Sequence, residues 1–411
     1  MRICVLSSEP RHNACARLRL ADILPHIGKP VDLDWFNIEL ALVDIDRVCA
    51  AIGEADVIII QRSFPRQETM ALLEDMIITA SKPLIYETDD LLTALPDSHP
   101  EAAVYARHTP IITALMVNCD IVVVSTPALQ KTYLELYDDV AVFPNTLDRS
   151  LWYMPFVERR TNNDTGRPIR IGFCGSHTHL PDLQAIEPAL LRVVERFGDR
   201  VNLCFVGCVT EPLKRLPGTS FSGNFVHYAD YPRLIRSLDL DIGLAPLCDT
   251  NFNSHKSHVK YLEYAACGIP GIYSQLTAYA NTVVHRQTGL LVPQDSDAWY
   301  EAIATFIEDR ELANRIASNA YQDVWSRFAA DMAASEWNGI LERADLRFHM
   351  RSSSHSRTRR QLALAMWRQM RTYEHKLASN NTTRHDDTSQ MPNVHTAWRR
   401  IFNQLFGKTV N

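Results

Sequence analysis

Runs of β-branched and other apolar residues alternate with segments of helical apolar spacing along most of the chain. Continuous apolar runs of this length predict strands buried on both faces, and amphipathic spacing between them predicts helices. The strand-like runs are residues 3–6, 31–36, 57–61, 84–87 and 121–124, then 169–174, 201–206, 225–228, 241–247, 269–273 and 290–292. The helical segments are residues 17–27, 44–52, 66–80 and 101–118, then 183–197, 232–238, 257–267 and 297–307.

Strand–helix alternation is typical of a mostly parallel sheet covered by helices on both faces. A polar, turn-rich segment at residues 161–168 interrupts the alternation and is predicted to be an interdomain linker, after which the alternation starts again. We therefore expect an α/β fold of two doubly wound, Rossmann-like domains, at residues 1–160 and 169–345, facing a cleft. Residues 346–411 lack this pattern and are expected to form a basic, partly flexible tail. Ligands of such folds bind at the carboxyl ends of the strands.

Composition excludes several broad classes. Hydrophobic residues make up 46% and charged residues 22% of the 411 residues, as in ordinary globular proteins, so the whole chain is not disordered. No apolar run approaches the length of a membrane span or of a signal-peptide core, and we expect a cytoplasmic protein. The 9 cysteines are scattered through predicted strands and helices, which indicates reduced core thiols instead of a disulfide framework or a zinc site.

The charge distribution sets the tail apart. Residues 346–411 hold 12 Lys and Arg against 3 Asp and Glu, although the whole chain has a net charge of −6. Apolar side chains recur there at helical spacing beside basic ones, a pattern that suits an interfacial helix on the anionic inner face of a membrane. Packing on the body of the same protein or on a partner protein is the alternative. The stripe consists of Trp398, Ile401, Phe402, Leu405 and Phe406, flanked by Arg399, Arg400 and Lys408.

Several common motifs are missing from the sequence. Neither half opens with Gly-x-Gly-x-x-Gly, and no phosphate-binding Gly-x-x-x-x-Gly-Lys-Ser/Thr or His-Glu-x-x-His is present. This weakens the case for a nicotinamide dehydrogenase, an NTPase or a zinc hydrolase. We expect no bound metal, no cofactor and no nucleic-acid partner.

The most informative segment follows the strand-like run 241–247. A polar loop with Lys256 and Ser257 opens a predicted helix, and a helix start beside a lysine is a ready anion site. Glu263 lies further along the same helix, where its carboxylate can accept hydrogen bonds from ribose hydroxyls. Together these groups predict a binding site for a nucleoside diphosphate. The plainer alternatives are a surface Glu263 paired with Lys260, and two lysines that only solvate a helix face.

This segment resembles the donor-site signature of GT-B glycosyltransferases of family 4. In that signature an acidic residue stands eight positions before a second Glu, followed by Ala-x-Gly-x-Pro and a later Asn-Gly-Leu-Leu-Val. Glu263 matches the second acid, and residues 265–270 and 288–292 match the later elements, whereas His255 stands at the first acidic position. The variant looks most like transferases of bacterial O-antigen and capsule clusters.

Two further segments share the resemblance. Residues 143–148 resemble the Pro-Asn-Gly-x-Asp element that ends the first domain, with Asn145 in the matching position. Residues 171–176 resemble the glycine turn after the first strand of the donor domain, which ends in Gly175 and Ser176.

The resemblance implies transfer of a sugar from a nucleotide-diphosphate donor to a hydroxyl of a glycan or lipid-linked acceptor in surface polysaccharide biosynthesis. It also implies retention at the anomeric carbon without a metal. The expected catalytic residues are Lys256 and Asp90. The expected donor-binding residues are Gly175, Ser176, His255, Ser257, Lys260, Glu263, Arg11 and Asn145.

The candidates in the first domain follow predicted strands. Arg11 or Arg17 is placed to reach the donor diphosphate, although a plain surface arginine is the alternative. Asp89 or Asp90 is placed to orient an acceptor hydroxyl or take its proton, although Asp90 also suits a helix cap.

Two other functions remain open. Because His255 replaces an acid, the chain is alternatively a nucleotide-sugar binding protein without catalysis. A GT-B epimerase acting on a UDP-sugar is the other alternative.

Overall fold

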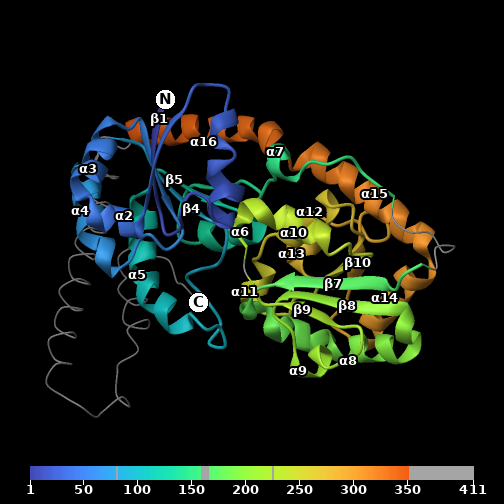
Figure 1. Cartoon of the computed structure of the whole chain (residues 1–411). Helices are drawn as coiled ribbons and strands as arrows, with labels where there is room; N and C mark the ends of the chain where they lie inside the picture. The colour runs from blue at the N-terminus through green and yellow to red at the C-terminus, as the bar shows by residue number, and fades with distance from the viewer. Residues whose placement is uncertain (80–81, 159–165, 225, 351–411) are drawn as a thin grey trace, which may run out of the picture. The chain divides into compact units, whose positions relative to one another are not determined.

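The computed structural model describes residues 1–79, 82–158, 166–224 and 226–350. Most of the expected linker at 161–168 and the tail beyond Met350, with its apolar basic stripe, lie outside these residues. Within them, no helix has the length and apolar character needed to cross a membrane. The chain divides into two compact units, which we call unit 1 and unit 2 (Figure 1).

Unit 1 comprises Met1–Arg11, Lys29–Phe143 and the chain from Glu336 onward. The described part of this unit has six strands, which are all parallel and lie in the order β2-β1-β3-β4-β5-β6. Strands β3, β4 and β5 are buried along their whole length, as continuous apolar runs in a parallel sheet should be. The strands are β1 (Arg2–Ser7), β2 (Asp32–Asn37), β3 (Val57–Gln61), β4 (Leu84–Thr88), β5 (Ile121–Val124) and β6 (Val140–Val142). The helices are α2 (Ile38–Val43), α3 (Ile45–Glu54), α4 (Met70–Thr79), α5 (Ala102–Asn118), α6 (Pro127–Leu134) and most of α16 (Ala330–Met350).

The last helix completes unit 1. Trp337 of α16 is fully buried, and its ring centroid lies 5.7 Å from that of Phe143. One turn and a half further on, Arg343 donates from Nε to Asp139 Oδ2 at 3.0 Å, and Arg347 pairs with the same carboxylate at 3.2 Å. Asp139 is buried, so these two guanidinium groups supply its counter-charge.

Unit 2 comprises His12–Gly28 and Pro144–Ser335. Its six parallel strands lie in the order β12-β11-β10-β7-β8-β9. Numbered within the unit, this is the dinucleotide-fold order 3-2-1-4-5-6, and it reverses between β7 and β10. The strands are β7 (Ile169–Gly175), β8 (Val201–Gly207), β9 (Ser220–Ser222), β10 (Ile242–Ala245), β11 (Gly271–Ser274) and β12 (Leu290–Val292). The helices are α1 (Ala14–Ala16), α7 (Arg149–Trp152), α8 (Leu180–Phe197), α9 (Glu211–Lys214), α10 (Tyr231–Ser237), α11 (Asn251–Ser254), α12 (Val259–Ala266), α13 (Thr277–Ala280), α14 (Ser296–Glu308) and α15 (Arg310–Arg327).

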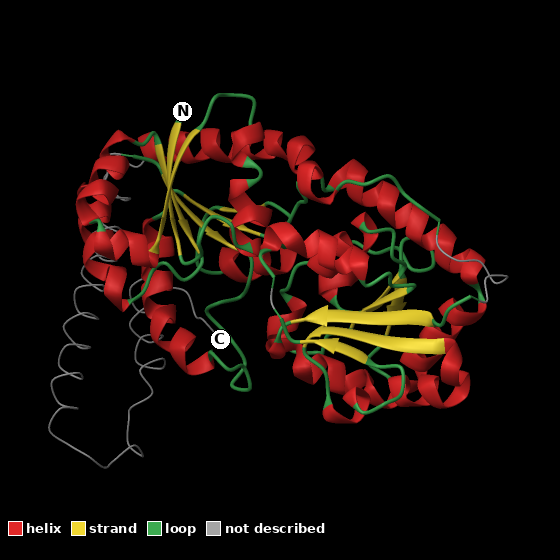
Figure 2. Ribbon diagram, in the orientation of Figure 1, coloured by secondary structure: helices red, strands yellow, loops and turns green. Residues whose placement is uncertain are grey.

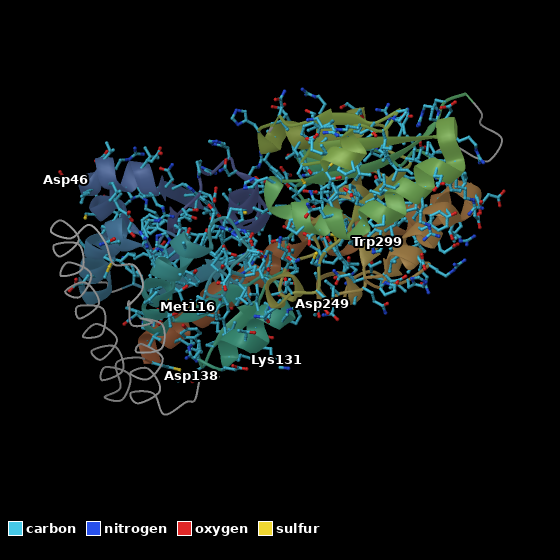
Figure 3. The ribbon with its side chains drawn as sticks, turned by 90° about the horizontal axis from the view of Figure 1, so that it is seen from below. Asp46, Met116, Lys131, Asp138, Asp249 and Trp299 are labelled. Atoms are coloured by element: carbon cyan, nitrogen blue, oxygen red, sulfur yellow. The ribbon has the colours of Figure 1, made fainter. Side chains whose placement is uncertain are left out.

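Helices cover both faces of the unit 2 sheet (Figure 2). One core cluster joins the sheet to α8 and α14, and it includes Ile171, Phe173 and the fully buried Trp299. The second cluster joins the other face to α10, α12 and α13. Neighbouring residues of one strand, such as Ile272 and Tyr273, belong to different clusters because successive side chains of a strand point to opposite faces. Figure 3 shows the side chains, with Trp299 inside unit 2 and the exposed Asp46 on unit 1.

The expected fold class, two doubly wound Rossmann-like domains, is confirmed, and the differences concern individual elements. The strand predicted at residues 225–228 is not present in its described part, residues 226–228; β9 lies at Ser220–Ser222 and a 3₁₀ turn at Tyr228–Asp230. The predicted helix 17–27 is a π-helical turn at Arg17–Ala21 and a 3₁₀ turn at Leu24–His26, because Pro25 cannot continue a helix.

The compact units also differ from the contiguous ranges 1–160 and 169–345. Residues 12–28 belong to unit 2, where Leu18 is part of the core, and Glu336 onward belongs to unit 1. Unit 2 begins at Pro144 because Leu147 bridges to Ala329 and Trp152 donates to the Tyr228 hydroxyl at 3.1 Å.

Candidate functional site

The carboxyl ends of β7 and β10 mark the point at which ligands of this topology bind. Strand β7 ends at Gly175, and Ser176 begins the 3₁₀ turn His177–His179 that leads into α8. A Cβ at Gly175 would lie 2.7 Å from the Phe173 ring and 3.3 Å from His179 Cβ. Glycine therefore allows the chain to turn tightly here, with the His179 side chain close to the strand end.

His179 connects two charged side chains from distant parts of the chain. Its Nδ1 lies 2.8 Å from Asp182 Oδ2, and its Nε2 lies 3.4 Å from the ammonium of Lys256. Asp182 Oδ1 also accepts from the Cys248 backbone N–H at 2.7 Å and from Asn253 Nδ2 at 3.1 Å. The loop after β10 is thereby attached to the start of α8, with Lys256 at its end.

The protonation states follow from these contacts. Burial would raise the pKa of Asp182, but its hydrogen bond with His179 and the Cys248 N–H outweigh burial, so its pKa lies below the ordinary value. Burial, followed by the positive charge of Lys256, lowers the pKa of His179 below 6.5. Near neutral pH Asp182 is thus a carboxylate and His179 a neutral imidazole.

The ammonium of Lys260 is paired with Glu263, the residue predicted to bind the ribose hydroxyls. Lys260 Nζ donates to Glu263 Oε2 at 2.7 Å and to the Tyr231 hydroxyl at 2.9 Å. The Glu263 side chain is only 4% exposed. Burial would lower the pKa of Lys260, but the Glu263 charge outweighs burial and holds that pKa above its ordinary value. The Lys260–Glu263 pair, which the sequence analysis gave as the alternative to a ribose-binding Glu263, is therefore present.

Asn145 and Ser257, which the sequence proposed separately, lie together. Asn145 Nδ2 donates to Ser257 Oγ at 2.7 Å, and Asn145 Oδ1 accepts from Arg19 at 3.2 Å. Helix α12 begins at Val259 with His258 as its N-cap, so Ser257 precedes the helix instead of opening it. His255 is buried with its Nδ1 2.6 Å from the Asn251 carbonyl oxygen.

The two remaining candidates, Arg11 and Asp90, belong to unit 1. Arg11 is exposed in the turn after β1. Asp90 follows β4, and its Oδ2 lies 3.4 Å from Arg62 Nη1, which also pairs with the buried Asp89. Arg62 has φ 54°, in the left-handed region where non-glycine residues are uncommon. This conformation presents a guanidinium and two carboxylates at the carboxyl ends of β3 and β4.

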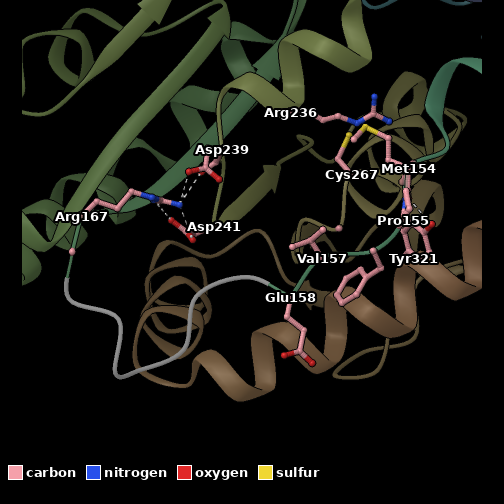
Figure 4. A pocket seen from close by; sticks show the side chains of 14 residues that line it. Met154, Pro155, Val157, Glu158, Arg167, Arg236, Asp239, Asp241, Cys267 and Tyr321 are labelled. Atoms are coloured by element: carbon pink, nitrogen blue, oxygen red, sulfur yellow. Dashed lines mark hydrogen bonds and ion pairs between the residues drawn. The ribbon is translucent and has the colours of Figure 1, made fainter.

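A cavity of about 700 Å³ lies elsewhere in unit 2 (Figure 4). Its charged wall includes Arg167, which pairs with Asp239 at 2.8 Å and with Asp241 at 2.7 Å. Arg167 and Asp241 immediately precede β7 and β10, so this cavity lies at the amino ends of the strands, opposite the candidate site. Among the described residues, no group of three or more His, Cys, Asp and Glu is arranged to hold a metal ion.

Sequence reasoning missed three residues of the site in unit 2: His179, Asp182 and Arg19. The His-x-x-Asp spacing directly after the glycine turn is a readable signal for the first two, since it pairs an N-terminal helix turn with the preceding loop. No sequence signal marks Arg19, which is fully buried on the π-helical turn.

Comparisons with known proteins concern the fold and one segment of the chain. A family model described as glycosyl transferase-like matches residues 200–338, the segment that supplies Lys256 and Glu263. Similar solved structures include HepE from Anabaena in complex with UDP, with 17% identity, a TM-score of 0.58, and coverage of 83% of this chain and 100% of that one. The fold is that of GT-B glycosyltransferases.

Two further structures share this fold. Sucrose-phosphate synthase from Thermosynechococcus elongatus has 14% identity and a TM-score of 0.57 over 83% of this chain and 98% of its own. A glycosyltransferase from Rickettsia africae has 12% identity and a TM-score of 0.58 over 84% and 98%. No curated protein matches the chain in sequence.

Proposed function

We propose that the chain is a glycosyltransferase that moves a sugar from a nucleoside-diphosphate donor to a hydroxyl of a glycan or lipid-linked acceptor in surface polysaccharide biosynthesis. The observation that carries the proposal is the ammonium of Lys256, held by His179 beside the glycine turn at the topological switch point of unit 2. Such a group suits the diphosphate of a sugar nucleotide, and the family model that matches this segment supports the same activity.

The chemistry needs charge stabilisation at the leaving group. The bond from the anomeric carbon to the donor phosphate oxygen breaks, and a bond to the acceptor oxygen forms on the same face of the sugar. Because the new bond forms on the face that the leaving group vacates, the configuration is retained without a protein nucleophile or a metal. The departing diphosphate takes the acceptor proton. Lys256 and the backbone N–H groups of Gly175 and Ser176 stabilise the negative charge that develops on the diphosphate.

The other candidates complete the proposal. Glu263 accepts from the ribose hydroxyls, and Lys260, Ser257, Asn145 and His255 line the donor side; Arg11 reaches the diphosphate. Asp90 orients the acceptor hydroxyl. UDP-sugars are the first donors to test, because the similar HepE structures are complexes with UDP and with UDP-glucose.

Activity assays of the full chain test the proposal. Thermal-shift screening of nucleotide sugars identifies the donor, and transfer is then measured to lipid-linked acceptors. Lys256→Ala should lower kcat more than it raises the donor KM, because the diphosphate is more anionic in the transition state than in the ground state. Binding without transfer or donor hydrolysis, under all donors and acceptors, overturns the proposed activity.

That outcome favours a binding protein without catalysis. One observation supports this second candidate: His255, where the resemblance expects an acid, is buried against the Asn251 carbonyl oxygen.

A further inference from the structure

The hydrogen bonds around Asp182 fix the tautomer of His179. Two donors other than histidine already reach Asp182 Oδ1, from the Cys248 backbone and the Asn253 amide. With its carboxylate only 5% exposed and ionised, Asp182 Oδ2 accepts the Nδ1–H of His179. A proton on Nδ1 leaves a lone pair on Nε2, as carboxylates do when they orient histidines in other sites.

That lone pair faces the ammonium of Lys256. The 3.4 Å separation of Nε2 and Nζ allows Lys256 to donate a hydrogen bond to the imidazole. The Phe252 ring, 5.2 Å from Nζ, provides a cation–π contact that limits the same side chain. A flexible lysine otherwise loses considerable rotamer entropy when it is fixed on a ligand.

We infer that His179 is a positioning residue, which Asp182 orients and which holds the Lys256 ammonium in place for the diphosphate of the donor. The inference rests on the proposed function, because it assigns a role to Lys256 on that donor. His179 itself does not touch the reacting atoms; it acts through Lys256.

A dependence on pH follows from the groups that face His179. These are Asp182 on α8, Lys256 in the loop after α11, and Lys260 on α12, whose charge also reaches the ring. Protonation of Nε2 removes the acceptor and places a positive charge 3.4 Å from the ammonium. Donor binding should therefore weaken as the pH falls through the His179 pKa, which burial and Lys256 hold below 6.5.

Two substitutions of His179 test its contact with Asp182 and its contact with Lys256 separately. His179→Asn keeps a donor near the Nδ1 position for Asp182 but has nothing at Nε2. His179→Gln extends an amide oxygen toward the Nε2 position and restores an acceptor for Lys256. His177→Asn, at an exposed histidine of the same turn, is the matched control.

Affinity for UDP, measured by calorimetry on the full chain, is the readout. His179→Asn should bind UDP about tenfold more weakly than wild type, corresponding to about 1.4 kcal/mol. His179→Gln should recover most of this loss, and His177→Asn should bind as wild type. In a Lys256→Ala background, His179→Asn should cause no further loss, because the contact through which it acts is gone. Below the His179 pKa, wild type and His179→Asn should bind UDP almost equally well. The comparison uses the ratio of the two affinities, because the titration of UDP itself affects both equally.

The outcomes distinguish the positioning role of His179 from the proposed function. If wild type binds UDP and His179→Asn binds equally well with an unchanged melting temperature, the positioning role is overturned and the proposed function stands. A further loss in the Lys256→Ala background also overturns it, since His179 would then act independently of Lys256. If wild type binds neither UDP nor any other nucleoside diphosphate tested, the proposed function fails and the inference fails with it.

Discussion

The Lys260–Glu263 pair allows a sharp test of stability at the candidate site. Glu263 carries 4% and Lys260 22% side-chain exposure, and their charged atoms are 2.7 Å apart. Removing one partner of a buried ion pair typically costs 3–5 kcal/mol, whereas replacing both with apolar side chains is often nearly neutral. The two single substitutions should therefore be far from additive.

The exposures predict which single substitution costs more. Among the described residues, Lys260→Met leaves the buried carboxylate with only the Tyr231 hydroxyl, at 3.5 Å, and should cost about 3 kcal/mol. Glu263→Leu leaves an ammonium that still reaches solvent and the Tyr231 hydroxyl, and should cost about 2 kcal/mol. The double variant should cost about 1 kcal/mol or less, below the two losses combined by about 4 kcal/mol.

Urea unfolding followed by tryptophan fluorescence measures these differences, with Trp152 as a local reporter because its ring lies 6.2 Å from that of Tyr231. Losses that simply add would show that the pair contributes no mutual stabilisation and would refute the reasoning. The same double variant tests the ribose role independently of stability. Wild type should bind UDP more tightly than its 2′-deoxy analogue, and the folded double variant should lose that preference.

Two further predictions concern pH and the end of the chain. Burial, followed by the charge of Arg327, lowers the pKa of His258 to about 4. Between pH 6.5 and 4 the His258 side chain is therefore protonated in the unfolded chain and neutral in the native chain. The free energy of unfolding should therefore fall by up to about 3 kcal/mol between pH 6.5 and 4, and His258→Asn should flatten this slope in urea titrations. A chain ending at Met350 should fold normally yet lose binding to anionic vesicles at low salt, whereas equal binding by both forms would remove the membrane role of the tail. A chain ending at Ala344 is a poorer control, because it also removes the Arg347–Asp139 ion pair and should melt at a lower temperature.

The parts of the fold that could be read from sequence are the buried ones. Strands β3 and β5 are rich in β-branched residues, a composition that is typical of central parallel strands. Of the four edge strands, β2 (Asp32–Asn37) and β12 (Leu290–Val292) were predicted and two were missed: β9 (Ser220–Ser222) is polar and largely exposed, and β6 (Val140–Val142) has only three residues. Neither carries a periodicity that separates a strand from a loop.

The candidate site likewise has residues that could be predicted from the sequence and residues that could not. Lys256 and Glu263 could be proposed because they share one short segment with a recognisable motif. The partner of Lys256 is 77 positions away along the chain, and nothing in a single sequence says that these two positions meet. The pairing of Glu263 with Lys260 was foreseen only as an alternative, because an i, i+3 charge pair has the same spacing whether it is buried or exposed.

The division of the chain between the two units has a consequence for folding during synthesis. Unit 1 starts at Met1 but needs Trp337, whose ring packs on Phe143, and Arg343, which neutralises the buried Asp139. All of unit 2, which ends at Ser335, is made before these residues leave the ribosome. Domains usually complete themselves in the order of their synthesis. Here the unit that is begun first is finished last, because the residues that cover Phe143 and pair with Asp139 are synthesised after all of unit 2.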